Sequence, residues 1–313
     1  MLTPNPLKKG DQVAITAASG VCDPAKLQNG ILTLEKIGLK VKVMPSCYAK
    51  HDYLAGTDIQ RAADLHEAFA DKSIRAIFMA RGGYGAARLL PLINFNLIRQ
   101  NPKILVGFSD VTALHIAINQ ICKLVTYHGP MPAATFGTSP INPITLESLV
   151  NTIMSRGQGD VSPRSSYQLN ILYPGNASGI LTGGNLTLIA ASLGTPYEIK
   201  TRGRILFMEE TQEAPYRVDR LFLQLKQARK FKHAAGIILG DFSPETTETL
   251  HTAISELILT EKKPTLSGLP CGHTTPNITL PLGGWAKIMG SKESAHQLEI
   301  HIHPEKAMAH KRF

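Results

Sequence analysis

The first half of the chain alternates short apolar runs, typical of buried strands, with longer amphipathic segments, typical of helices. This alternation predicts βαβ units and therefore a largely parallel sheet with flanking helices. Functional sites on such sheets lie beyond the carboxyl ends of the strands, so the loops that follow the strands are the places to look for chemistry. The expected strands are Gln12–Ala17, Lys40–Met44, Ile74–Ala80 and Ile104–Val106, and the expected helices are Lys26–Ile37 and Asp58–Ala70.

The length of 313 residues is more than one hydrophobic core usually holds, so two domains are expected. Between Pro140 and Gly179 the alternation loosens and turn-forming residues accumulate. We therefore expect an α/β protein with a mostly parallel N-terminal sheet, a smaller C-terminal α/β or mixed-sheet domain, and an active site in the cleft between them. The expected boundaries are residues 1–160 for the first domain, 161–178 for the linker and 179–313 for the second domain.

The net charge of +9 and the isoelectric point near 9.4 raise the question of a nucleic-acid partner. The positive charges are spread along the chain, and no aromatic-rich basic stripe accompanies the densest cluster, Lys226–Lys232. We therefore expect no nucleic acid as a partner. A small anionic substrate is favoured instead, because a basic protein attracts one electrostatically.

The sequence also bounds the compartment in which the protein works. No apolar run approaches the roughly 18 residues of a membrane helix, so no membrane partner is expected. The N-terminus lacks the long apolar segment of a secretory signal. The four cysteines are scattered without a Cys-x-x-Cys pair, which is typical of free thiols in a reducing compartment. These features predict a cytoplasmic protein.

A serine lies where the expected strand 104–106 gives way to a helix-like pattern. The segment Lys103–His115 is typical of a strand, a tight turn and a helix, with Ser109 at the turn. A serine there has an exposed hydroxyl beside the amides of the helix start, which is what a nucleophile and a developing oxyanion need. The alternative is that Ser109 only caps the helix, since serine is a preferred cap residue.

A glycine-rich loop follows the expected strand 74–80. Arg81-Gly82-Gly83-Tyr84-Gly85 lacks both common phosphate-binding patterns, so a nucleotide loop is a poor fit. Glycines allow the backbone to approach a ligand closely, and the amide of Gly83 could be an oxyanion donor. The alternative is a plain turn after a strand.

A carboxylate and a histidine complete a catalytic set. Glu209 and Glu210 end an apolar strand, and because successive strand residues point to opposite sides, one of them should face inward and could orient a histidine. His273 follows another apolar run and is the first choice for a general base, with His128 as the strongest rival. The order Ser, Glu, His matches that of the α/β-hydrolases, although Ser109 lacks their Gly-x-Ser-x-Gly elbow. Spacing alone does not establish that these residues meet.

One further cluster resembles a metal site. Glu299, His301 and His303 alternate with apolar residues and share one face of an expected strand. The simpler interpretation is a half-solvated strand with its polar side outward. We therefore expect no metal.

Several short motifs, in this order, closely resemble those of the LD-carboxypeptidases, cytoplasmic serine peptidases of murein recycling. The resemblance extends from about Gly10 to Glu299. A sister branch comprises the microcin C immunity peptidases, and the Arg-Gly-Gly-Tyr-Gly loop looks like the murein branch. The motifs are Arg81–Arg88, Gly107–Asp110, Tyr127–Pro130, Gly183–Leu186, Leu206–Glu210 and Gly272-His273.

The resemblance implies roles for individual residues. Ser109 matches the nucleophile, Glu209 the orienting carboxylate and His273 the base, and the amides of Gly83 and Asp110 match the oxyanion hole. His128 then becomes a structural or pocket residue. The implied reaction attacks the bond between the L-centre of diaminopimelate and a terminal D-alanine, through an acyl-enzyme, with no metal or organic cofactor.

The implied partner is a small anionic muropeptide. A homodimer stays open as the assembly of the chain. The carboxylates of the muropeptide suggest Arg81 and Arg88 as binding residues, with Tyr84 beside them. An equally consistent alternative for the two arginines is a helix-end contact or a solvated face. Two alternatives stay open at this stage. One is a peptidase of the microcin C immunity type, and the other is a non-catalytic small-ligand binding protein with a two-domain cleft.

Overall fold

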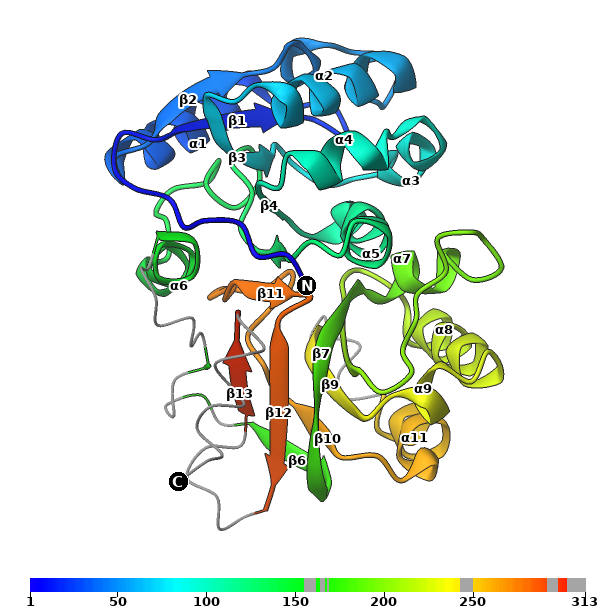
Figure 1. Ribbon diagram of the computed structural model, residues 1–313. Helices are drawn as coiled ribbons and strands as arrows, with labels where there is room; N and C mark the ends of the chain where they lie inside the picture. The colour runs from blue at the N-terminus through cyan, green and yellow to red at the C-terminus, as the bar shows by residue number, and fades with distance from the viewer. Residues whose placement is uncertain (155–161, 164–166, 168, 243–249, 292–297, 303–313) are drawn as a thin grey trace. The chain divides into compact units, whose positions relative to one another are not determined.

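In the computed structural model the chain divides into two compact units, Met1–Gln158 and Gly159–Phe313 (Figure 1). The structure describes residues 1–154, 162–163, 167, 169–242, 250–291 and 298–302. Each unit is built around a sheet and a buried core.

The sheet of the first unit is parallel throughout its described pairs. Its strands are ordered β5-β4-β3-β1-β2, and each neighbouring pair runs in the same direction. The expected parallel sheet is therefore confirmed. The strands are β1 (Gln12–Thr16), β2 (Lys40–Val43), β3 (Ile74–Met79), β4 (Ile104–Gly107) and β5 (Thr126–His128).

The helices of the first unit begin at recognisable capping residues. Asp23 accepts hydrogen bonds from the amides of Ala25 and Lys26 at the start of α1, and Thr57 accepts one from the amide of Gln60 at the start of α2. The helices are α1 (Pro24–Lys36), α2 (Asp58–Ala70), α3 (Ala86–Leu89), α4 (Phe95–Gln100), α5 (Thr112–Ile121) and α6 (Pro143–Met154), with 3-10 turns η1 (Pro45–Tyr48), η2 (Leu90–Leu92) and η3 (Ser109–Val111).

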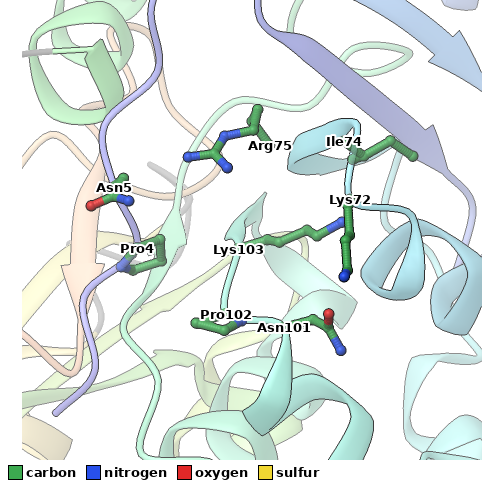
Figure 2. Close-up of a pocket in the computed structure, with 8 residues that line it drawn as sticks. All are labelled: Pro4, Asn5, Lys72, Ile74, Arg75, Asn101, Pro102 and Lys103. Atoms are coloured by element: carbon green, nitrogen blue, oxygen red, sulfur yellow. The ribbon is translucent and has the colours of Figure 1, made fainter.

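A hollow of about 280 Å³ lies at the amino ends of β3 and β4, with Lys72, Arg75 and Lys103 among its lining residues (Figure 2). The ammonium of Lys103 donates a hydrogen bond to the carbonyl of Ala68 (2.9 Å) and another to the carbonyl of Asp71, so it caps the end of α2. Burial lowers the pKa of Lys103 to about 8. Lys103 therefore ties β4 to α2, and it precedes the strand that leads to Ser109.

The sheet of the second unit is mixed, as expected. Its order is β13-β12-β7-β8-β9-β10-β6. The pairs from β7 to β10 are parallel, whereas β12 is antiparallel to both its neighbours and β6 is antiparallel to β10. The strands of this unit are β6 (Asn170–Tyr173), β7 (Gly175–Asn185), β8 (Ile205–Glu210), β9 (Gly236–Phe242), β10 (Thr265–Ser267), β11 (Leu280–Leu282), β12 (Trp285–Gly290) and β13 (Leu298–His301).

The helical segments of the second unit follow its parallel strands. They are α7 (Leu186–Ala191), α8 (Pro215–Gln227), α9 (Lys230–His233) and α11 (His251–Ala253), followed by a π-turn η4 (Ile254–Ile258) and a 3-10 turn η5 (Leu259–Glu261). The core of the sheet is aliphatic and aromatic, and includes Leu181, Ile205, Phe207, Ile238 and Leu280.

The interval 161–178 differs from the expected linker. It contains β6 and the first residues of β7, and Pro174 lies between these two strands. Of the turn-forming residues that suggested a linker, Pro174 separates two strands, and Gly175 and Asn176 begin β7. The strand β6 lies at the edge of its sheet, and its partly exposed residues lack the continuous apolar run of a central strand.

The four cysteines are free and buried. Among the described residues, no helix combines the length and the apolar character that crossing a bilayer requires.

Candidate active site

Ser109 lies directly beyond the carboxyl end of β4, at the start of η3, and is half-buried. Its φ of 63° is in the left-handed region, which is unfavourable for a residue other than glycine. Val111 occupies the N-cap of α5, and Phe108 precedes the 3-10 turn. Ser109 is thus inside the tight turn and not at a cap position, which leaves the capping alternative without structural support.

The glycine-rich loop packs against this serine. A Cβ at Gly82 would lie 2.9 Å from both Cβ and Oγ of Ser109, so a larger residue would collide with the hydroxyl. Gly83 and Gly85 have φ values of 117° and 131°, which side-chain-bearing residues rarely adopt. The loop therefore depends on its glycines to pass this close to Ser109.

Two of the candidate substrate-binding residues are engaged within the first unit. The guanidinium of Arg81 donates to the carbonyls of Val21 (2.9 Å) and Gly82 (3.3 Å). Arg88 Nε donates to both carboxylate oxygens of Asp58, at 3.0 and 2.9 Å.

Tyr84, the third candidate, is 55% exposed, with its ring centroid 6.0 Å from that of Tyr53. Of the three candidate side chains, Tyr84 is the one whose surface is most open to a ligand.

The side chain of Asp110 was not singled out from the sequence. It is buried, and its Oδ2 accepts hydrogen bonds from the hydroxyl of Ser19 (2.6 Å) and the amide of Ala86 (2.7 Å). Desolvation raises the pKa of this carboxyl, opposed by the two hydrogen bonds and by the charge of Arg61. Ser19 and Asp110 are 91 positions apart, so sequence spacing offered no signal for this contact.

In the second unit Glu209 and His273 form a close pair. Glu209 is fully buried at the end of β8, and its Oε2 lies 2.7 Å from Nδ1 of His273. His273 follows Gly272, whose φ is 121°. A Cβ on Gly272 would lie 2.6 Å from that same Oε2, so the glycine permits the contact. Glu209 therefore holds the His273 ring through its Nδ1 atom.

The surroundings of His273 favour its charged form. Burial lowers the pKa of His273, but the hydrogen bond and charge of Glu209 outweigh it, helped by the charges of Glu210 and Asp241, so the net pKa is raised. Desolvation also raises the pKa of Asp241, which lies on β9 and was not predicted as a site residue. This arrangement can stabilise an imidazolium.

Glu210 has different partners from Glu209. It accepts hydrogen bonds from Asn185 Nδ2 (2.9 Å), from the amide and hydroxyl of Thr187 (2.9 and 2.7 Å) and from the amide of Thr211 (2.9 Å). Thr187 lies in the first turn of α7, where a carboxylate is stabilising. The two neighbouring carboxylates diverge, as strand geometry predicted.

The rival histidine and the suspected metal cluster have simpler explanations. His128 is fully buried at the end of β5, against the ring of Phe108 (5.7 Å between centroids). Glu299 lies 3.5 Å from the ammonium of Lys287, and His303 is outside the described residues. Among the described residues, no group of three histidine, cysteine or acidic side chains is arranged to hold a metal ion.

Two family models match the chain: the LD-carboxypeptidase N-terminal domain over residues 13–129 and the LD-carboxypeptidase C-terminal domain over residues 178–288. The chain belongs to the LD-carboxypeptidase family. The resemblance stated from the sequence motifs is thereby confirmed, and the two family domains fall in different units of the structure.

Individual relatives represent both branches of this family. A probable murein peptide carboxypeptidase of Bacillus subtilis is 40% identical over 301 residues, covering 93% of each chain. The microcin C7 self-immunity protein MccF of Escherichia coli is 29% identical over 312 residues, covering 89% of this chain and 90% of MccF.

Solved structures share the fold. An MccF-like protein from Bacillus anthracis superposes with a TM-score of 0.89 at 29% identity, covering 97% of this chain and all of that one. MccF in complex with glutamyl sulfamoyl guanosine gives a TM-score of 0.84 at 26% identity, covering 95% of this chain and 98% of MccF. The two-domain α/β fold is therefore that of the family.

Proposed function

We propose that this protein is a cytoplasmic serine LD-carboxypeptidase that removes the terminal D-alanine from murein tetrapeptide in peptidoglycan recycling. The observation that carries the proposal is the 2.7 Å contact between Glu209 and His273, placed in a family domain of carboxypeptidases. The name of the Bacillus subtilis relative, at 40% identity, supports the murein substrate.

In this mechanism Nε2 of His273 takes the proton of Ser109 while Glu209 holds the ring and stabilises the imidazolium. The serine oxygen attacks the carbonyl that joins the L-centre of diaminopimelate to D-alanine. The amides of Gly83 and Asp110 donate to the oxyanion. His273 then protonates the leaving D-alanine, and water, deprotonated by the same ring, releases the tripeptide from Ser109. The mechanism requires the two units to bring His273 to Ser109.

The substrate is anionic, and the chain has a net charge of +9 that steers such a molecule toward it. We assign substrate contact to Tyr84, Arg81 and Arg88, with Tyr84 the most exposed of the three. Arg88 already forms an ion pair with Asp58. To bind a substrate carboxylate, Arg88 must either bind both carboxylates at once or leave Asp58.

The test is product analysis with murein tetrapeptide, the tripeptide and free D-alanine being the expected products. The second candidate, a peptidase of the microcin C immunity type, is favoured by the TM-score of 0.84 to MccF bound to a glutamyl sulfamoyl nucleotide. The same assay with an aminoacyl sulfamoyl nucleotide decides between the two, by comparison of kcat/KM. A fluorophosphonate probe with intact-mass detection tests for a reactive serine, which a binding protein lacks.

A further inference from the structure

A buried ion-pairing side chain and a buried carboxylate meet at one peptide group of the glycine-rich loop. Arg61, on α2, is fully buried, and its Nη1 donates to the carbonyl of Gly85 (3.1 Å). Asp110, with 2% of its surface exposed, accepts from the amide of Ala86 (2.7 Å). The carbonyl of Gly85 and the amide of Ala86 belong to one peptide group. Arg61 therefore binds the carbonyl side of this group and Asp110 binds its amide side.

The same two side chains also hold the loop that follows β1. Arg61 Nη1 donates to the carbonyl of Ala18, and the hydroxyl of Ser19 donates to Asp110 Oδ2 (2.6 Å). The amide of Gly20 in turn donates to the carbonyl of Gly82 (3.3 Å). Two loops that are far apart in the sequence are thus fastened to each other and to the turn that bears Ser109.

The charges are arranged to keep this assembly in place. Arg61 pairs with Asp58, whose carboxylate is shared with Arg88. A buried carboxylate that accepts two hydrogen bonds, and a buried guanidinium that makes several, are costly to move because either would leave unpaired polar atoms in the interior. The positions of the Gly85–Ala86 peptide and of Asp110 are therefore coupled.

We infer that Asp110 and Arg61 are positioning residues that set the spacing of the two oxyanion-hole amides, through a clamp on the Gly85–Ala86 peptide. The inference rests on the proposed function, in which those amides belong to Gly83 and Asp110. Asp110 contributes its own amide to the hole, and through its side chain it fixes the loop that carries the other amide. Oxyanion donors act through preorganisation, so a loosened loop lowers kcat more than it raises KM.

The test is Asp110→Asn, which keeps the shape of the side chain and one acceptor oxygen but removes the charge. Asp64→Asn is the matched control. Asp64 is also a buried carboxylate of the first unit, with 6% of its surface exposed, and its Oδ2 accepts from the amide of Ser46 at 2.6 Å. It lies on α2, and its hydrogen bond is with η1 and not with the glycine-rich loop.

Steady-state kinetics on murein tetrapeptide are measured for the wild type and both variants, at concentrations corrected for folded protein. We expect Asp110→Asn to lower kcat by about 10- to 100-fold with KM changed by less than about 3-fold. Asp64→Asn should lower the melting temperature and leave kcat unchanged. An unchanged kcat in Asp110→Asn, or an equal loss in both variants, overturns the inference.

Hydrogen exchange supplies a readout that does not depend on turnover. The segment 82–89 should exchange faster in Asp110→Asn than in the wild type, because the Ala86 amide loses a charged acceptor, and should keep the wild-type rate in Asp64→Asn. If the wild type releases no D-alanine, the proposed function is wrong. Hydrogen exchange then still tests whether Asp110 holds the Gly85–Ala86 peptide in place. Unchanged exchange in Asp110→Asn overturns the clamp whatever the substrate.

Discussion

Replacing Glu209 with glutamine keeps the shape of the side chain but removes the charge that faces His273. The contact is 2.7 Å long and Glu209 is fully buried. A hydrogen bond to a charged group contributes about 1.5–3 kcal/mol, which corresponds to about 10- to 150-fold in rate if it is lost in the transition state. A glutamine amide that donates to Nδ1 would also place the ring proton on Nε2, the wrong tautomer, for which losses of about 10⁴ are known in triads. We therefore expect kcat to fall by about 10²- to 10⁴-fold.

Glu210→Gln is the matched control, since Glu210 is the neighbouring buried carboxylate. Its partners are Asn185, Thr187 and Thr211, so its loss should destabilise the start of α7 by about 1–3 kcal/mol and change kcat by less than about 3-fold. Both variants are assayed at saturating tetrapeptide, and thermal unfolding is followed in parallel. A folded Glu209→Gln enzyme with near-normal kcat would refute the reasoning. A larger loss of kcat in Glu210→Gln than in Glu209→Gln would show that Glu210, and not Glu209, orients the histidine.

Three further predictions concern the serine, the pH dependence and metals. Ser109→Ala should reduce kcat by at least about 10³-fold and change the unfolding free energy by about 1 kcal/mol or less, because Ser109 is not at a helix cap; wild-type turnover by the purified variant would end the serine mechanism. His273 must be neutral to accept a proton, and its pKa is raised above the ordinary value of 6.5, so kcat/KM should fall with decreasing pH around a midpoint above 6.5. In Glu209→Gln this midpoint should move to lower pH, and an unmoved midpoint would assign the titration to another group. EDTA should leave activity unchanged, and a loss that added metal reverses would contradict this.

The parallel sheet could be predicted because its central strands β1, β3 and β4 each contain a short, buried apolar run. For example, β4 is buried along its whole length and was expected at 104–106. The turn bearing Ser109 could be predicted because the chain changes there from a strand pattern to a helix pattern within a few residues. By contrast, β6 was missed, since an edge strand of four partly exposed residues has no such run.

Some residues of the candidate site could be predicted from the sequence, and others could not. Glu209 and His273 could be predicted as candidates because each lies at the end of an apolar strand-like run, and in the structure they lie 2.7 Å apart. The roles of Arg61 and of the Asp110 side chain could not be found in this way, because their partners Ala18 and Ser19 are distant in sequence. Arg81 stays a candidate for substrate binding, and the hydrogen bonds of its guanidinium to the carbonyls of Gly82 and Val21 are contacts that only the folded loops create.

The conformation of Ser109 links these local observations to function. A non-glycine residue at a φ of 63° costs about 1–2 kcal/mol relative to a relaxed backbone. Glycine would relieve that strain, and the chain has glycine at positions 82, 83 and 85 of the neighbouring loop, where the backbone or the space requires it. A serine in the strained position, with Gly82 packed against its hydroxyl, is therefore poorly explained by stability. Departures from local preference of this kind concentrate at functional sites, where a specific side chain is worth its cost in folding energy. The strained backbone of Ser109 and the close packing of Gly82 against its hydroxyl therefore support the proposal that Ser109 is the nucleophile.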